Sequence, residues 1–286
     1  MKKWTIAVLL FFFSISFSHA GSPVWEVSNG TNTLYLGGTI HVLAQDDYPL
    51  PKVFDTAYKN AEVLVFETDI GKMQDPEFGR QMMGQMVYSD GNTLQTLVQP
   101  STLSALAEFS SQRGIPIENL IPLKPGMVMV FLTLAELERL GAGGAGVDEF
   151  YFKKAMQDRL PIQFFESPIE QIKFLTDIGI GKEDEMIKYI LKDIDNLPTL
   201  LPIMKHAWRS GDNERLYKES LAPLKNDYPE IYHSLIVKRN LAWMPAIRQM
   251  LTTPEVEFIL VGALHLAGDQ GLIELLRKEG ISVKKY

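Results

Sequence analysis

Two segments of the sequence end an apolar run with a glycine that is followed three residues later by a histidine. Gly38 precedes His41 in the first segment, and Gly262 precedes His265 in the second. A glycine at the end of a strand allows a sharp turn or a close backbone approach. Ligands of open α/β sheets bind beyond the carboxyl ends of the strands. We therefore expect the two segments to be strands of one sheet that direct both imidazoles into one crevice.

Two glutamates, Glu67 and Glu166, also end strand-like apolar runs and add carboxylates to this candidate site. Imidazole and carboxylate groups together are suitable ligands for a divalent transition metal. The same groups can act as base and acid in a reaction without a metal. The residue types leave both kinds of chemistry open.

The chain of 286 residues contains no cysteine, which excludes thiolate nucleophiles, zinc ribbons and disulfide scaffolds. Any transition-metal site must therefore use imidazole and carboxylate ligands. A hydrophobic content of 46% is sufficient for a large buried core. The 28 Lys and Arg against 35 Asp and Glu give a net charge of −7, which argues against nucleic acid as a main partner.

A glycine-rich segment at residues 141–146 fits the G-x-G-x-x-G spacing of dinucleotide-binding turns. That fingerprint has to follow a strand directly, whereas residues 134–140 have the pattern of a strong helix. We therefore interpret the glycines as a corner between two helices that places Asp148 and Glu149.

The first twenty residues have the three parts of a secretory signal peptide. A basic start at Lys2 and Lys3 precedes an apolar run over residues 4–17, and small residues then precede a predicted cleavage near Ala20-Gly21. No later segment has the ~18 uninterrupted apolar residues that a spanning helix needs. We expect a mature chain that is periplasmic or secreted and does not span a membrane.

The elements that must position the candidate residues divide the mature chain into two kinds of sequence. Apolar strand patterns occur near both ends, with an Asn-Gly turn between the first two at residues 24–27 and 33–36. Residues of about 76–250 are mostly helical in pattern, and no Pro-, Gly- or Ser-rich linker interrupts them. The expected fold is one α/β domain over residues 21–286. Its central mixed sheet is formed from both chain ends, with a mostly helical middle insertion or lid.

The ordered set of motifs resembles the TraB/GumN family, whose animal relatives are the Tiki membrane proteases. The resemblance covers nearly the whole mature chain, from Pro23 to Val283. Its motifs are, in chain order, Val24-Trp25-Glu26-Val27, Tyr35-Leu36-Gly37-Gly38-Thr39-Ile40-His41, Val65-Phe66-Glu67-Thr68, Gly146-Val147-Asp148, Glu166-Ser167, Glu170-Gln171, Arg239-Asn240 and Val261-Gly262-Ala263-Leu264-His265.

This resemblance implies a divalent metal, such as manganese or cobalt, held by His41, His265 and Glu67. It also implies that four further motif residues are second-layer or substrate-facing groups: Asp148, Glu166, Arg239 and Asn240. The fold would be similar to that of erythromycin-esterase-like and ChaN-like proteins, among which haem binding also occurs.

The function that we expect is an exported metal-dependent hydrolase that acts on a peptide or protein substrate. A manganese, cobalt or zinc ion would activate water, with Glu166 or Asp148 as general base, and Arg239 would stabilise the oxyanion or bind a substrate carboxylate. Two alternatives remain open. One is a non-catalytic protein that binds haem, a metal or a peptide beneath a methionine-rich helical lid, and the other is a metal-free, esterase-like hydrolase.

Overall fold

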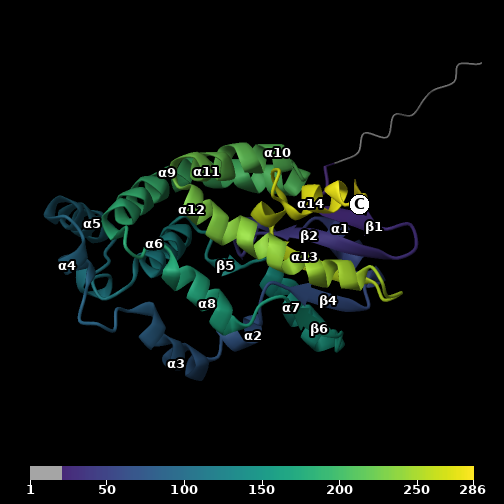
Figure 1. Ribbon diagram of the computed structural model, residues 1–286, viewed down its shortest axis with the longest axis horizontal. Helices are drawn as coiled ribbons and strands as arrows, with labels where there is room; N and C mark the ends of the chain where they lie inside the picture. The colour runs from purple at the N-terminus through teal and green to yellow at the C-terminus, as the bar shows by residue number, and fades with distance from the viewer. Residues whose placement is uncertain (1–20) are drawn as a thin grey trace, which may run out of the picture.

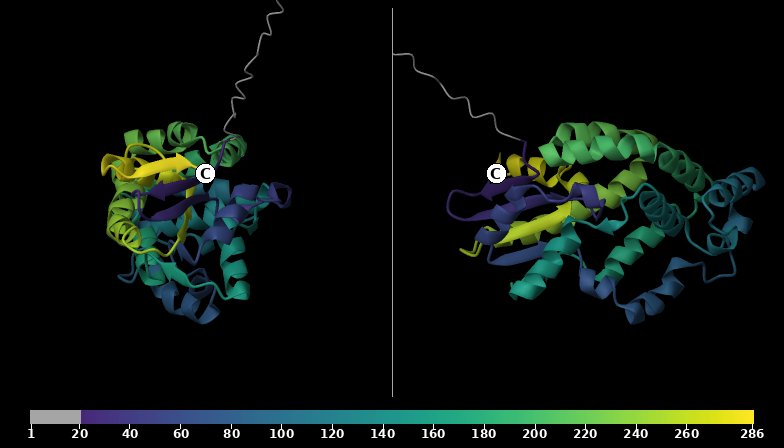
Figure 2. Two further views of the ribbon diagram at one scale, coloured as in Figure 1. Left: turned by 90° about the vertical axis from the view of Figure 1, so that its right-hand side faces the viewer. Right: turned by 180° about the vertical axis from the view of Figure 1, so that it is seen from behind.

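The structure is a computed structural model that describes residues 21–286, so the signal peptide predicted for residues 1–20 lies outside the described residues. The molecule is longer than it is wide. The sheet lies at one end and helices α3 (Pro76–Met86), α4 (Leu94–Leu97) and α5 (Pro100–Gln112) lie at the other (Figures 1 and 2). The expected α/β fold, with a sheet built from both chain ends and a helical middle region, is confirmed.

The main sheet has six strands in the order β6-β4-β7-β2-β1-β8. Strands β2, β7, β4 and β6 run parallel to one another, whereas β1 is antiparallel to both of its neighbours. The strands are β1 (Val24–Ser28), β2 (Thr33–Thr39), β4 (Val63–Phe66), β6 (Ile162–Phe164), β7 (Glu257–Gly262) and β8 (Ser282–Lys285). The predicted Asn-Gly hairpin joins β1 and β2, with Gly30 at a φ of 92° that favours glycine.

The remaining elements are mainly helices. The helices not yet named are α1 (Lys52–Asn60), α2 (Ile70–Met73), α6 (Pro125–Arg139), α7 (Val147–Asp158), α8 (Pro168–Asp177), α9 (Glu183–Ser210), α10 (Asn213–Leu216), α11 (Ala222–Asp227), α12 (Pro229–Tyr232), α13 (Lys238–Met250) and α14 (Leu272–Lys278). Short 3₁₀ turns lie at Gln45–Asp47, Ile117–Asn119 and Ala263–Leu266, and π-helical segments lie at Tyr217–Leu221 and His233–Val237.

Strands β2, β4 and β7 are buried on both faces, which explains why their sequences read as continuous apolar runs. One face carries Leu64 and Phe66 of β4 and packs against α1, α7 and the end of α9. The opposite face carries Val63 and Val65 and packs against α13 and α14. A separate apolar core holds α5, α6 and α9 together in the helical region. None of the helices described between residues 21 and 286 is long and apolar enough to cross a membrane.

The glycine-rich segment forms a structure that the sequence did not predict. Gly144–Ala145 is a short strand, β5, which pairs antiparallel with β3 (Val42–Leu43). A Cβ on Gly146 would lie 2.2 Å from the backbone carbonyl carbon of His41, so the two segments touch where only a glycine fits. The segment does join two helices, α6 and α7, and places Asp148 and Glu149 in the first turn of α7, as expected, but it contains a strand that was not predicted. The glycines let the start of α7 approach the backbone next to His41.

Candidate active site

The candidate site lies beyond the carboxyl ends of neighbouring strands. Strand β2 pairs with β7 in a register that places Thr39 opposite Gly262, and β4 flanks β7 on its other side. The two Gly-x-x-His segments are therefore adjacent in the sheet, as their matching patterns predict. Glu67 follows β4 directly and reaches the same edge, where its Oε1 accepts a 2.6 Å hydrogen bond from the Gly262 N–H.

Arg239 of α13 is the hub that joins the acidic residues. Its guanidinium donates to both carboxylate oxygens of Glu166, at 2.8 and 2.9 Å, and to Glu67 Oε2 at 2.6 Å. All three side chains are at most 9% exposed. Such buried, charge-assisted bonds fix both carboxylates, because breaking one would leave a charge without a partner.

His265 is held as a neutral imidazole with a defined tautomer. Its Nδ1 lies 2.7 Å from Asn240 Oδ1, which can only accept, so Nδ1 carries the proton. Its Nε2 then accepts from Arg239 Nη1 at 3.1 Å. Burial lowers the pKa of His265 to about 3, which agrees with the neutral form. Asn240 also donates from Nδ2 to the carbonyl oxygens of His265 and Gln270, so it fixes the turn as well as the ring.

His41 differs from the other site residues because its side chain is 64% exposed. Its Nδ1 lies 2.9 Å from Asp148 Oδ2, and the Thr39 hydroxyl donates to the other oxygen of Asp148 at 2.6 Å. The negative charge of Asp148 raises the pKa of His41 to about 9. A solvent-accessible imidazole oriented by a carboxylate through Nδ1 is the arrangement of a general base in many hydrolases.

Glu67 and His41 meet over the glycine of the second histidine segment. A Cβ placed on Gly262 would lie 3.3 Å from Glu67 Oε1 and 3.3 Å from His41 Nε2. Burial alone would raise the pKa of Glu67, but the charges of Arg239 and His41 and the hydrogen bond from the Gly262 N–H outweigh it and hold this pKa well below its usual range. An ionised carboxylate oxygen and an imidazole nitrogen therefore both lie close to one point above Gly262.

The three predicted metal ligands lie near one another, with His265 Nε2 4.0 Å from Glu67 Oε1, but their ligating atoms are not arranged around one point. His41 Nε2 and Glu67 Oε1 face the space over Gly262, but His265 turns its Cδ2 edge to it, 3.7 Å from the same point, and its Nε2 to Arg239. Across residues 21–286, no group of three or more His, Asp or Glu side chains is placed to hold one metal ion. The residues described do not fit a three-ligand metal, and the metal stays a prediction drawn from the resemblance.

The seven residues named from the sequence lie in two hydrogen-bonded groups at the same edge of the sheet: one is centred on Arg239 and the other is the pair His41–Asp148. The members are His41, Glu67, Asp148, Glu166, Arg239, Asn240 and His265. Two side chains that sequence reasoning missed complete these groups. Thr39 fixes Asp148, and Trp243 donates from Nε1 to Glu166 Oε1 at 2.9 Å. Trp243 lies four residues after Arg239, one helical turn along α13, and that spacing could have identified it.

Comparison with known proteins assigns the family. Residues 23–285 match the TraB/PrgY/gumN family, so the chain belongs to it. The chain is 26% identical over 254 residues to a protein of Escherichia coli strain K12 named "Uncharacterized protein YbaP", covering 87% of this chain and 89% of the relative. The protein of that name from Shigella flexneri matches with the same identity and coverage. No solved structure matches.

Proposed function

We propose that the chain is a hydrolase of carbonyl substrates in which the pair His41–Asp148 supplies the acid–base chemistry. The observation that carries the proposal is the combination of exposure and orientation at His41. Its ring is accessible, its Nδ1 is fixed by Asp148, and its Nε2 faces the space next to the ionised Glu67. Within the buried network around it, His41 is the imidazole that a substrate or a water molecule can reach.

In this proposal, neutral His41 removes a proton from an attacking water at Nε2, and Asp148 stabilises the imidazolium that forms. Glu67 Oε1, beside the same space, accepts the second proton of that water in a hydrogen bond and so orients its lone pair. His41 then returns its proton to the leaving group. Arg239 holds Glu67 in place through the 2.6 Å bond and keeps it ionised.

The substrate class follows from the chemistry of the pair and from the family. A base that activates water attacks the carbonyl carbon of a peptide or an ester. The resemblance to proteases favours a peptide, and the signal-peptide pattern of residues 1–20 supports an activity outside the cytoplasm.

A metal-dependent hydrolase is the second candidate function. It is favoured by one observation, which is that His41 Nε2 and Glu67 Oε1 border the same space over Gly262. The contact of Arg239 with His265 argues against it. The guanidinium donates to His265 Nε2, and His265 would need that nitrogen to act as the third ligand.

Removal of metal separates the two candidates. The mature protein, residues 21–286, is dialysed exhaustively against a chelator and then assayed with p-nitrophenyl esters and a fluorogenic peptide library. We expect hydrolysis to be kept within about twofold of the untreated protein, because the acid–base pair consists of side chains alone. The visible spectrum of the same preparation is expected to show no Soret band. Loss of activity that Mn²⁺, Co²⁺ or Zn²⁺ restores would instead establish the metal-dependent candidate.

A further inference from the structure

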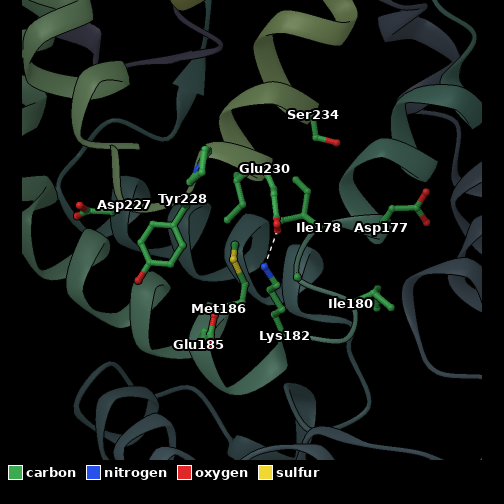
Figure 3. Close-up of a pocket in the computed structure, with 13 residues that line it drawn as sticks. Asp177, Ile178, Ile180, Lys182, Glu185, Met186, Asp227, Tyr228, Glu230 and Ser234 are labelled. Carbon is green, nitrogen blue, oxygen red and sulfur yellow. Dashed lines mark hydrogen bonds and ion pairs between the residues drawn. The ribbon is translucent and has the colours of Figure 1, made fainter. Parts of the chain in front are cut away.

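A cavity of about 310 Å³ lies away from the candidate active site, between the turn joining α8 to α9 and the turn joining α11 to α12 (Figure 3). This volume falls in the range of ~300–1,000 Å³ that is typical of small-molecule sites. Its apolar floor includes Ile178 and Met186, which are 4% and 2% exposed, and Ile231 adds a partly buried side chain.

The charged side chains of this cavity are strongly unequal in sign. Four acidic residues line it, Asp177, Glu185, Asp227 and Glu230, against the single ammonium of Lys182. Asp177 is already paired at 2.7 Å with Lys173, which does not line the cavity, so three carboxylates face Lys182 alone. Burial and then the nearby charges of Asp227 and Glu185 raise the pKa of the Tyr228 phenol, as expected where negative charge gathers. A cation with an apolar body is therefore more complementary to the rim and the floor than an anion is.

The chain already places one ammonium in this cavity. Lys182 Nζ lies 2.7 Å from Glu230 Oε2, and Figure 3 shows this pair among the lining side chains. The two side chains are 55% and 73% exposed, and pairs of that exposure contribute little to stability. An incoming ammonium can therefore replace Lys182 at Glu230 at small cost. A bare metal ion is a poor alternative, because these carboxylates are not among any group of three placed to hold one in the described chain.

We propose that the cavity between the α8–α9 and α11–α12 turns binds an aliphatic ammonium compound, with its hydrocarbon chain on Ile178 and Met186 and its charge among the carboxylates. The ammonium can belong to a free amine or to the side chain of a lysine in a peptide. The proposal does not depend on the reaction proposed above.

The first test uses n-pentylamine as the probe and the methyl NMR signal of Met186 as the readout. We expect a saturable shift with a dissociation constant on the order of 1 mM. The neutral 1-pentanol and the anion pentanoate, which have the same chain length, should shift the signal far less. A response to 1-pentanol equal to that of n-pentylamine would overturn the proposal. The same titration is then repeated with N-acetyl-lysine methylamide. A similar shift would show that lysine side chains are ligands too, and a shift with n-pentylamine alone would show that the ligands are free amines.

The second test removes the internal competitor. Lys182→Gln should tighten n-pentylamine binding by up to about fivefold, because Glu230 loses its partner, whereas Glu185→Gln should weaken it by a similar factor. Lys188→Gln is the matched control. It makes the same charge change six residues along α9, at a lysine that pairs with Asp184 outside the cavity. Equal affinities of the Lys182→Gln and Lys188→Gln variants would contradict the proposal, and a gain of binding cannot be attributed to misfolding.

Discussion

Replacing Arg239 by methionine is expected to lower the free energy of unfolding by about 3–5 kcal/mol. Methionine keeps much of the volume of the side chain but removes all four hydrogen bonds that the guanidinium makes to Glu67, Glu166 and His265. Two carboxylates that are 6% and 8% exposed would then lack their counter-ion. Breaking a buried ion pair on one side costs more than the pair itself contributes, because a buried charge is left uncompensated.

The measurement for Arg239→Met is urea unfolding followed by circular dichroism at pH 8 and at pH 5. The loss should be larger at pH 8, because the unpaired carboxylates can be neutralised by protons at the lower pH. Arg248→Met is the matched control on the same helix. Arg248 pairs with Glu279, but these side chains are 49% and 35% exposed, so we expect a cost of at most ~1 kcal/mol. Equal costs for the two variants would show that Arg239 is not the hub of the network.

Replacing His41 by asparagine is expected to lower kcat by about 10²–10⁴-fold while leaving the fold intact. Asparagine can place an amide nitrogen near the position of Nδ1 and keep the bond to Asp148, but it has no counterpart of Nε2. The side chain is 64% exposed, so the free energy of unfolding should change by less than ~1 kcal/mol.

The assay for His41→Asn is steady-state hydrolysis of whichever ester or peptide probe the wild-type protein cleaves. His206→Asn is the control, because His206 is an exposed histidine of α9 outside the network. We expect it to keep the wild-type kcat. Wild-type turnover by the His41→Asn variant would remove His41 from the mechanism, whatever the chelation experiment shows.

The architecture of the sheet was predictable because it follows from local patterns. The apolar runs before His41, Glu67 and His265 are buried strands, and their shared Gly-x-x-His ending identified two of them as neighbours. The order of the strands determines which residues at their ends lie close together. The residues that make up the site could therefore be predicted from the sequence and the family resemblance.

The bonding within the site was not predictable, because it depends on how α13 packs against the sheet. The sequence indicated Arg239 as a stabiliser of the oxyanion, but the packing of Trp243 and Met244 on the sheet places its guanidinium between Glu67 and Glu166. No pattern in the sequence sets the distance between groups 172 residues apart. In the same way, the pairing of Gly144 with Leu43 is a tertiary contact, and the glycine-rich sequence between two helices gives no indication of it.

The dependence of kcat on pH in the wild-type protein and in Asp148→Asn tests the central claim most directly. His41 acts as a base when its imidazole is neutral, and its pKa is raised to about 9, mainly by Asp148. We therefore expect the wild-type rate to rise with pH through a midpoint near 9. In Asp148→Asn the midpoint should fall toward the ordinary value of 6.5, because the largest cause of the shift is gone. A wild-type rate that is independent of pH between 6 and 10, or a midpoint that Asp148→Asn leaves unchanged, would contradict the assignment of His41–Asp148 as the acid–base pair.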